Sequence, residues 1–227
     1  MVLAGKVFTL TEEVELDTIA TKLRDFNSND EYEFQDQTLT LTKEVRDLTL
    51  TSDSLKGVFS MDTVLILNQR GKEVATPKTI MAPFVFSRYG DRNMLTVLEK
   101  KERANNIANA LSKLLFIGVG GIVEARISPE VLRQYHEKNF EDTKIIFFDD
   151  VDIPNVGKLS LYGSELANST LYTEYLSHGK IWYIVIKSKD YGYVVGITRT
   201  AVVTVFSALD EKELMDFVQN EIYSLIE

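Results

Sequence analysis

The C-terminal stretch from Ile181 to Ile226 constrains the fold most, because three strand patterns are followed there by one helix pattern. Residues 181–186 (IWYIVI) are apolar at every position, which predicts a strand that is covered on both faces. Residues 193–205 are apolar mainly at odd positions and carry threonine at several even ones, which is typical of half-buried strands. With a turn at Asp190–Tyr193, the stretch predicts an antiparallel ladder of three strands.

One amphipathic helix follows this ladder. Asp210 is a favourable N-cap residue, and Glu213 stands three residues later, as in a capping box. The apolar residues behind them have helical spacing and form one stripe: Leu214, Phe217, Val218, Ile222 and Leu225. We expect this helix to cover one face of the strands.

The N-terminal part of the chain shows the same kinds of pattern. A short strand is expected at Lys6–Leu10, followed by a helix that Thr11 caps. Phe26–Glu31 is polar and predicts a turn. Thr38–Thr42 and Leu48–Thr51 alternate with a period of two, and predict the two strands of a hairpin.

Further strands and a closing helix are expected before residue 118. Strands are predicted at residues 63–67, 79–87 and 94–98. Apolar residues spaced three and four apart from Ala104 to Leu115 predict the helix, which Gly118 would end.

The remaining elements complete the second half of the chain. A strand is expected at Ile122–Ile127, and Ser128-Pro129 marks the start of a helix whose buried face extends to Phe140. Two more strands are expected at Lys144–Phe148 and Lys158–Tyr162.

The order of elements therefore repeats. Residues 1–117 and 118–227 each predict a strand, a helix, several antiparallel strands and a closing helix. The LTVL sequence at Leu95–Leu98 and VTVF at Val203–Phe206 occupy matching places before the two closing helices. This order is similar to the duplicated topology of the TATA-box-binding proteins. We expect an α+β fold of two similar halves, each an antiparallel sheet with helices on one face.

Charge and composition limit the classes of partner. The 227 residues carry a formal charge of -9 and no cysteine, which excludes disulfides and thiolate metal sites. The charge is -2 up to Ile117 and -7 from Gly118 on, which disfavours non-specific binding to nucleic acid. No apolar run is long enough to cross a membrane, so we expect a cytoplasmic protein. The negative charge favours a protein partner. We expect no cofactor, and the oligomeric state stays open.

Two groups of residues could form a metal-dependent site. Asp149, Asp150 and Asp152 are the densest carboxylate cluster and follow an expected strand, where metal sites often lie. Separately, Asp91, Glu99 and Lys101 resemble the order of acids and lysine in restriction-endonuclease-like nucleases, which use a metal ion to activate water. In that reading the protein is a hydrolase or nuclease. Polar residues at the start of a helix explain Glu99 and Lys101 equally well.

One segment combines basic residues with an aromatic ring. Such a combination can hold a nucleic-acid backbone or another partner. It consists of Arg88, Tyr89, Arg92, Lys100, Lys101 and Arg103. Acidic residues interrupt the segment, which favours a mixed solvated surface.

The remaining motifs do not indicate a catalytic site. His136 and His178 do not have the spacing of a metal motif, so both are expected at the surface. The glycines of Gly118–Gly121 follow a helix and precede a strand, which is the reverse of a phosphate-binding loop, and suit a joint between the halves.

The sequence therefore favours a non-catalytic binding or scaffold protein, which engages a macromolecule through its sheet faces or through the cleft between its halves. Besides the metal-dependent hydrolase, a second alternative is a small-molecule carrier. Its cavity would lie between sheet and helix and would be lined by Trp182, Tyr193 and Phe217.

Overall fold

The computed structural model describes residues 3–116, 120–139, 141 and 143–227. Within these residues the fold is mixed α+β, with antiparallel strands and five α-helices. The chain forms two compact units. We call them the C-terminal unit (Met1–Thr9, Leu98–Ala104 and Glu124–Glu227) and the arm unit (Leu10–Val97 and Asn105–Val123).

The arm unit contains an antiparallel meander in which each strand pairs with the next along the chain. Its strands are β2 (Asn27–Phe34), β3 (Gln37–Leu50), β4 (Ser54–Gln69), β5 (Lys72–Tyr89) and β6 (Arg92–Val97). Two-residue turns at Arg70-Gly71 and Gly90-Asp91 connect the later strands. Both glycines have positive φ, which such turns require.

Helix α1 (Leu16–Leu23) packs on the base of this meander. Ile19 and Leu23 of α1 are fully buried, and the rings of Phe26 and Phe59 stack at 6.4 Å between centroids. Lys22 Nζ donates to the carbonyl of Leu115 at the end of α2 (Lys101–Leu115), where a cation complements the helix dipole.

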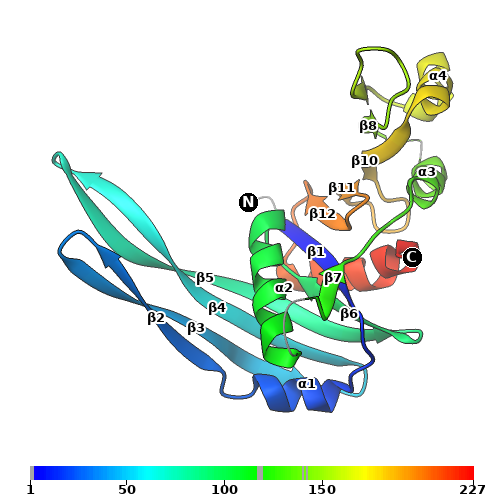
Figure 1. Cartoon of the computed structure of the whole chain (residues 1–227). Coiled ribbons are helices and arrows are strands. Elements are labelled where there is room, and N and C mark those ends of the chain that lie inside the picture. Colours follow the sequence, from blue (N-terminus) through cyan, green and yellow to red (C-terminus); the bar gives the residue numbers. More distant parts are fainter. Residues whose placement is uncertain (1–2, 117–119, 140, 142) are drawn as a thin grey trace. The chain divides into compact units, whose positions relative to one another are not determined.

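Beyond this base the meander separates into two hairpins, β2–β3 and β4–β5 (Figure 1). The paired residues of β3 and β4 end at Lys43 and Met61. At this branch the Asp62 carboxylate accepts hydrogen bonds from the Thr42 amide (2.9 Å) and the Thr79 hydroxyl (2.7 Å). These hydrogen bonds lower the pKa of Asp62, the larger effect coming from Thr79. Asp62 thereby satisfies an amide just where β3 loses its pairing with β4.

The C-terminal unit is built on a second run of antiparallel strands. Their spatial order is β1 (Leu3–Leu10), β12 (Val202–Val205), β11 (Val194–Thr198), β10 (Lys180–Lys187), β8 (Ile145–Asp149) and β9 (Leu159–Tyr162). Strand β7 (Ile122–Glu124) lies where the chain passes from the arm unit into the C-terminal unit.

Helices of the C-terminal unit bury one face of these strands. They are α3 (Pro129–Lys138), α4 (Thr170–His178) and α5 (Glu211–Phe217), which continues as a π-helical turn at Val218–Ile222 and a 3-10 turn at Tyr223–Leu225; a further 3-10 turn is Leu166–Asn168. Figure 1 shows α3 and α4 on the same side of β10. The buried residues on that side include Ile146, Phe148, Ile184, Ile186 and Ile197.

Several expected elements are confirmed. The three terminal strands are present, and Asp210 and Glu213 form the capping box of α5. Ser128 caps α3 by accepting a hydrogen bond from the Val131 amide (3.3 Å). The expected helix stop at Gly118 and the buried face at Phe140 lie outside the described residues.

Other expectations in the arm unit are wrong. Thr11 caps no helix, because α1 begins five residues later and the Thr11 hydroxyl contacts the Gly120 carbonyl (3.3 Å). The polar segment Phe26–Glu31 is mostly strand, since it pairs with β3. The expected hairpin at Thr38–Thr51 is one continuous strand, β3, and the hairpin turn falls at Gln35-Asp36. Polar side chains are compatible with strands that are exposed on one face.

The predicted two-fold repeat is not confirmed by the described elements. The arm unit has long hairpins, whereas the C-terminal unit has short strands and the additional helix α4. The division into residues 1–117 and 118–227 stays a prediction.

His136 is buried, which contradicts its expected surface position. Its Nδ1 lies 3.1 Å from the Tyr172 hydroxyl, so the contact joins α3 to α4. Burial lowers the pKa of His136 from 6.5 to about 4. His136 is therefore a neutral core residue near neutral pH.

We predict a pH-dependent loss of stability from this histidine. Because the folded-state pKa lies below the unfolded value, the unfolded chain binds the proton first, and stability falls as the pH drops from about 6.5 to about 4. Between neutral pH and pH ~4.5 the loss is about 2 kcal/mol. Urea unfolding of the wild type and of His136→Phe at both pH values measures it. Equal pH dependence in the two proteins would contradict the assignment.

Candidate binding face

Four aromatic side chains gather on the face of the C-terminal unit strands opposite to the helices. The ring centroid of Phe147 lies 5.8 Å from that of Tyr162, 5.6 Å from that of Trp182 and 5.4 Å from that of Tyr183. We call Phe147, Tyr162, Trp182 and Tyr183 the aromatic face. Its members come from β8, β9 and β10, so non-neighbouring parts of the sequence form one surface.

The strand register explains why these rings meet. Phe148 pairs with Ile181 and Phe147 pairs with Tyr183, so Trp182 is an extra residue in a β-bulge of β10. Both Trp182 and Tyr183 contact Phe147, and their own centroids are 5.7 Å apart. The bulge therefore adds a second large ring beside Phe147.

The helices cover the opposite side of the same strands. Phe148, the neighbour of Phe147 along β8, is fully buried and its ring meets the ring of Tyr175 in α4 at 5.8 Å. Neighbouring residues in a strand point to opposite faces. Phe147 is thus directed away from α4.

Gly196 of β11 gives Tyr183 its place on the sheet. A Cβ atom at position 196 would clash with the Tyr183 hydroxyl and lie 2.9 Å from two ring carbons. The ring can lie across β11 only because position 196 has no side chain. Burial in this position raises the pKa of Tyr183.

Trp182 has a cation over its ring and an unused donor. The Lys158 ammonium lies 4.9 Å from the ring centroid, within the range of a cation–π contact. The buried Trp182 Nε1 has no hydrogen-bond acceptor among the residues that the structure describes. Buried indole N–H groups usually have an acceptor.

The aromatic face is accessible to a partner. Tyr162 is 66% exposed, and Phe147, Trp182 and Tyr183 are half-buried. Cover on both faces of residues 181–186 was expected, and this is wrong for Trp182 and Tyr183, which are only half-buried and contact one another and Phe147. Strand β9 stands at the end of the strand order.

The predicted carboxylate cluster lies at the end of β8, and each member contacts a basic side chain. Asp149 forms an ion pair with Arg199, Asp150 lies 3.7 Å from Lys180, and Asp152 Oδ1 lies 2.8 Å from His178 Nδ1. Among the described residues no group of three or more His, Asp and Glu has an arrangement that could hold a metal ion. The metal site stays a prediction.

The predicted basic segment divides between the two units. Arg88, Tyr89 and Arg92 lie at the turn between β5 and β6 in the arm unit, where Arg88 pairs with Glu13. Lys100, Lys101 and Arg103 lie at the start of α2 in the C-terminal unit.

The three residues of the nuclease reading divide in the same way. Asp91 lies in the arm unit, whereas Glu99 and Lys101 lie in the C-terminal unit. Glu99 accepts a hydrogen bond from the Lys100 amide (2.8 Å) and pairs with Arg103 (3.1 Å). Its carboxylate therefore stabilises the start of α2.

The three residues that would line the cavity of a small-molecule carrier do not form one cluster. Trp182 belongs to the aromatic face, whereas the rings of Tyr193 and Phe217 meet at 5.9 Å on the helix side.

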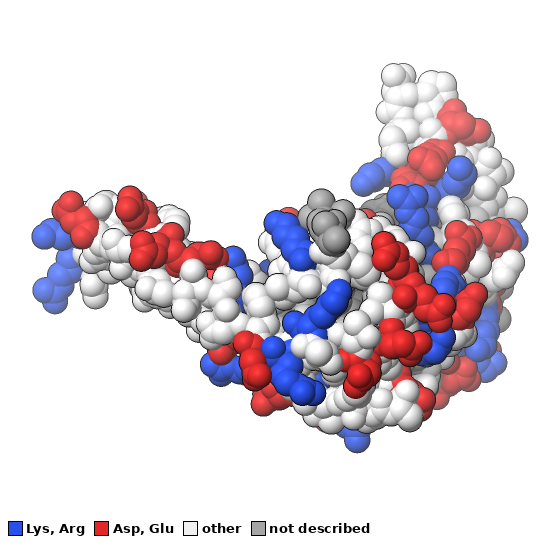
Figure 2. Space-filling view, turned by 60° about the horizontal axis from the view of Figure 1, so that its bottom comes forward, with Lys and Arg blue, Asp and Glu red and all other residues white. Residues whose placement is uncertain are grey.

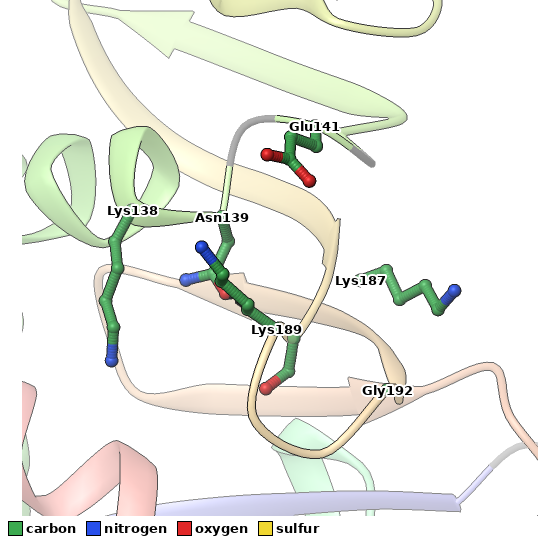
Figure 3. A pocket seen from close by; sticks show the side chains of 7 residues that line it. Lys138, Asn139, Glu141, Lys187, Lys189 and Gly192 are labelled. Atoms are coloured by element: carbon green, nitrogen blue, oxygen red, sulfur yellow. Dashed lines mark hydrogen bonds between the residues drawn. The ribbon is translucent and has the colours of Figure 1, made fainter.

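A separate pocket of about 300 Å³ lies beside the end of α3. Its lining includes Lys138, Lys187 and Lys189 with Asn139, Ser188, Glu141 and Gly192. The three ammonium groups do not converge, since Lys187 points away from Lys138, and Lys138 pairs with Asp190 at 3.1 Å (Figure 3). The Asn139 side chain accepts a hydrogen bond from the Lys189 amide and donates one to the Tyr135 carbonyl, both at 2.8 Å. The pocket is therefore a weaker candidate than the aromatic face.

Charges of both signs mix on the face of the molecule in Figure 2, and no broad basic surface is seen there. None of the described helices is both long and apolar enough to cross a membrane. No protein-family model matches the chain, and comparison with curated proteins finds no significant relative.

The sequence prediction named Trp182 only as part of a cavity between sheet and helix, and it did not single out Phe147, Tyr162 or Tyr183. The available signal was the run Ile145–Phe148, which is apolar at every position although helices bury only one face of β8.

We predict a coupling between positions 196 and 183. Gly196→Ala should destabilise the fold by about 1 to 2 kcal/mol, because the new methyl group displaces the Tyr183 ring. In a Tyr183→Ala background the same substitution should cost less than about 0.5 kcal/mol. Chemical denaturation of the four proteins gives the double-mutant cycle. An equal cost in both backgrounds would contradict the packing described.

Proposed function

We propose that the chain is a non-catalytic binding protein, which holds a polypeptide partner on its aromatic face. The observation that carries this proposal is the cluster of four rings, 5.4 to 5.8 Å apart where they contact Phe147, on the side of the strands opposite to the helices. Rigid rings offer a large contact area and lose little side-chain entropy on binding, which is why Tyr and Trp dominate binding hot spots.

Strand β9, which contributes Tyr162 to the aromatic face, supports a protein partner. From Leu159 to Tyr162 it contains no Asp, Glu, Lys or Arg residue. Depletion of charge with enrichment in aromatic residues distinguishes the centre of a protein interface from ordinary surface.

The same arrangement is less suited to single-stranded nucleic acid. Base stacking on aromatic rings requires basic side chains that follow the phosphates. Near the aromatic face, Arg199 pairs with Asp149 and Lys180 with Asp150, and Lys158 is held over Trp182. The formal charge of -9 adds a general repulsion.

The proposal also includes three predictions made from the sequence. We infer a cytoplasmic location and no cofactor, and we keep as a prediction that the two halves arose by duplication.

Selection from a random peptide library on the immobilised protein tests the proposal. The chain has one tryptophan, so the fluorescence of Trp182 reports binding at the aromatic face directly. We expect selected peptides to change this fluorescence, and Tyr162→Ala to weaken their affinity at least about tenfold, or about 1.4 kcal/mol.

Phe206→Ala is the matched control, because Phe206 is 50% exposed and lies outside the cluster. It should leave the affinity within about twofold. Equal losses in the two variants, or peptides that bind without changing Trp182 fluorescence, would count against the aromatic face.

A further inference from the structure

The two hairpins of the arm unit carry opposite charges. The acidic arm, residues 27–42 of β2 and β3, contains Asp30, Glu31, Glu33 and Asp36 and no basic residue. The basic arm, residues 63–78 of β4 and β5, contains Arg70, Lys72 and Lys78 with a single acid, Glu73. Their formal charges are therefore -4 and +2.

These charges have few partners within one chain. Asp30 pairs with Lys43 at the base of the acidic arm. Within the part of the chain that the structure describes, no ion pair is formed by the remaining acids of the acidic arm or by the three basic residues of the basic arm. The arms separate past the pair Lys43 and Met61, so they do not neutralise each other (Figure 1).

Both arms also continue the apolar face of the meander. Lys43 pairs with Met61 and Val45 with Phe59, so odd-numbered residues of β3 and β4 share the face that is buried at the base. On the acidic arm this face carries Tyr32 opposite Leu39, both half-buried. On the basic arm it carries Leu65 and Leu67, which are 42% and 47% exposed. The basic arm thus leaves Leu65 and Leu67 exposed, and the acidic arm leaves Tyr32 and Leu39 partly exposed.

The separation leaves strand edges unpaired as well. Residues 37–42 of β3 pair with β2 alone, and residues 63–69 of β4 pair with β5 alone. Unpaired edges with exposed apolar residues promote pairing with another chain, and natural proteins normally protect them.

We propose that a second copy of this chain covers the arms. In a two-fold symmetric dimer the acidic arm of each protomer lies against the basic arm of its partner, so the same complementary contact forms twice. The contact neutralises charges that are unpaired in one protomer and removes Leu65 and Leu67 from water.

Two other occupants fit the arms less well. A membrane surface would require apolar residues at the tip, whereas the tip of the basic arm reads Asn68, Gln69, Arg70, Gly71 and Lys72. Nucleic acid would be repelled by the four carboxylates of the acidic arm.

Analytical ultracentrifugation of the full chain measures the oligomeric state. We expect a dimer at micromolar concentration, with a dissociation constant that rises at least about tenfold between about 0.05 M and 0.5 M NaCl as the charges are screened. A wild-type protein that stays monomeric at these concentrations would overturn the proposal.

Charge reversal then tests which surfaces meet. One variant carries Glu31→Lys, Glu33→Lys and Asp36→Lys, and the other carries Arg70→Glu, Lys72→Glu and Lys78→Glu. Each variant alone has two arms of like charge and should be monomeric. Mixed together, they should form a heterodimer, because each positive arm then meets a negative one.

Glu174→Lys with Lys212→Glu is the control, since both residues are exposed and lie in the C-terminal unit. This variant should dimerise like the wild type. Circular dichroism melting shows whether every variant is folded. Dimers that survive either reversal, or variants that fail to associate on mixing, would place the interface elsewhere and overturn the arm-to-arm contact.

Discussion

Burial of one strand face by α3, α4 and α5 is the constraint on which the C-terminal unit depends. Ile146, Phe148, Ile184 and Ile186 are fully buried on that face, and the ring of Tyr175 in α4 packs against Phe148. The residues that alternate with these point the other way, and two of them, Phe147 and Tyr183, are aromatic. Strand alternation alone would place Phe147 and Tyr183 there, and the bulge adds Trp182. The position of the aromatic face is thus a direct result of how the core is packed.

The arm unit buries its apolar face only at the base of the meander. At its base α1 covers the meander, and past that base Asp62 caps the last pairing of β3 and β4. Beyond the base, two hairpins continue. Apolar residues of both hairpins lie on the same face that α1 covers at the base. Buried apolar area stabilises a fold, whereas the same residues left exposed favour association. The exposed apolar residues of the arms therefore favour association.

Local patterns in the sequence were sufficient for helices that begin at a recognisable N-cap residue. The capping residues Asp210 and Ser128 were predicted correctly. The same signal was present for α4, since Ser169 accepts a hydrogen bond from the Tyr172 amide, and it was missed. Strand β2 was missed because its residues are mostly polar and only pairing with β3 makes them a strand. The aromatic face depends on register across three strands, and no pattern within one segment encodes register.

The most direct test of the account is a ¹H–¹⁵N spectrum of the protein during titration with a selected peptide. Because the chain contains one tryptophan, the spectrum has one indole resonance, and the Trp182 Nε1 proton lacks an acceptor among the described residues. We predict that this resonance and the amide of Phe147 shift together as the peptide binds. A peptide that binds while both signals stay fixed, with shifts confined to the lysine-lined pocket or to the arms, would contradict the assignment of the aromatic face as the binding site.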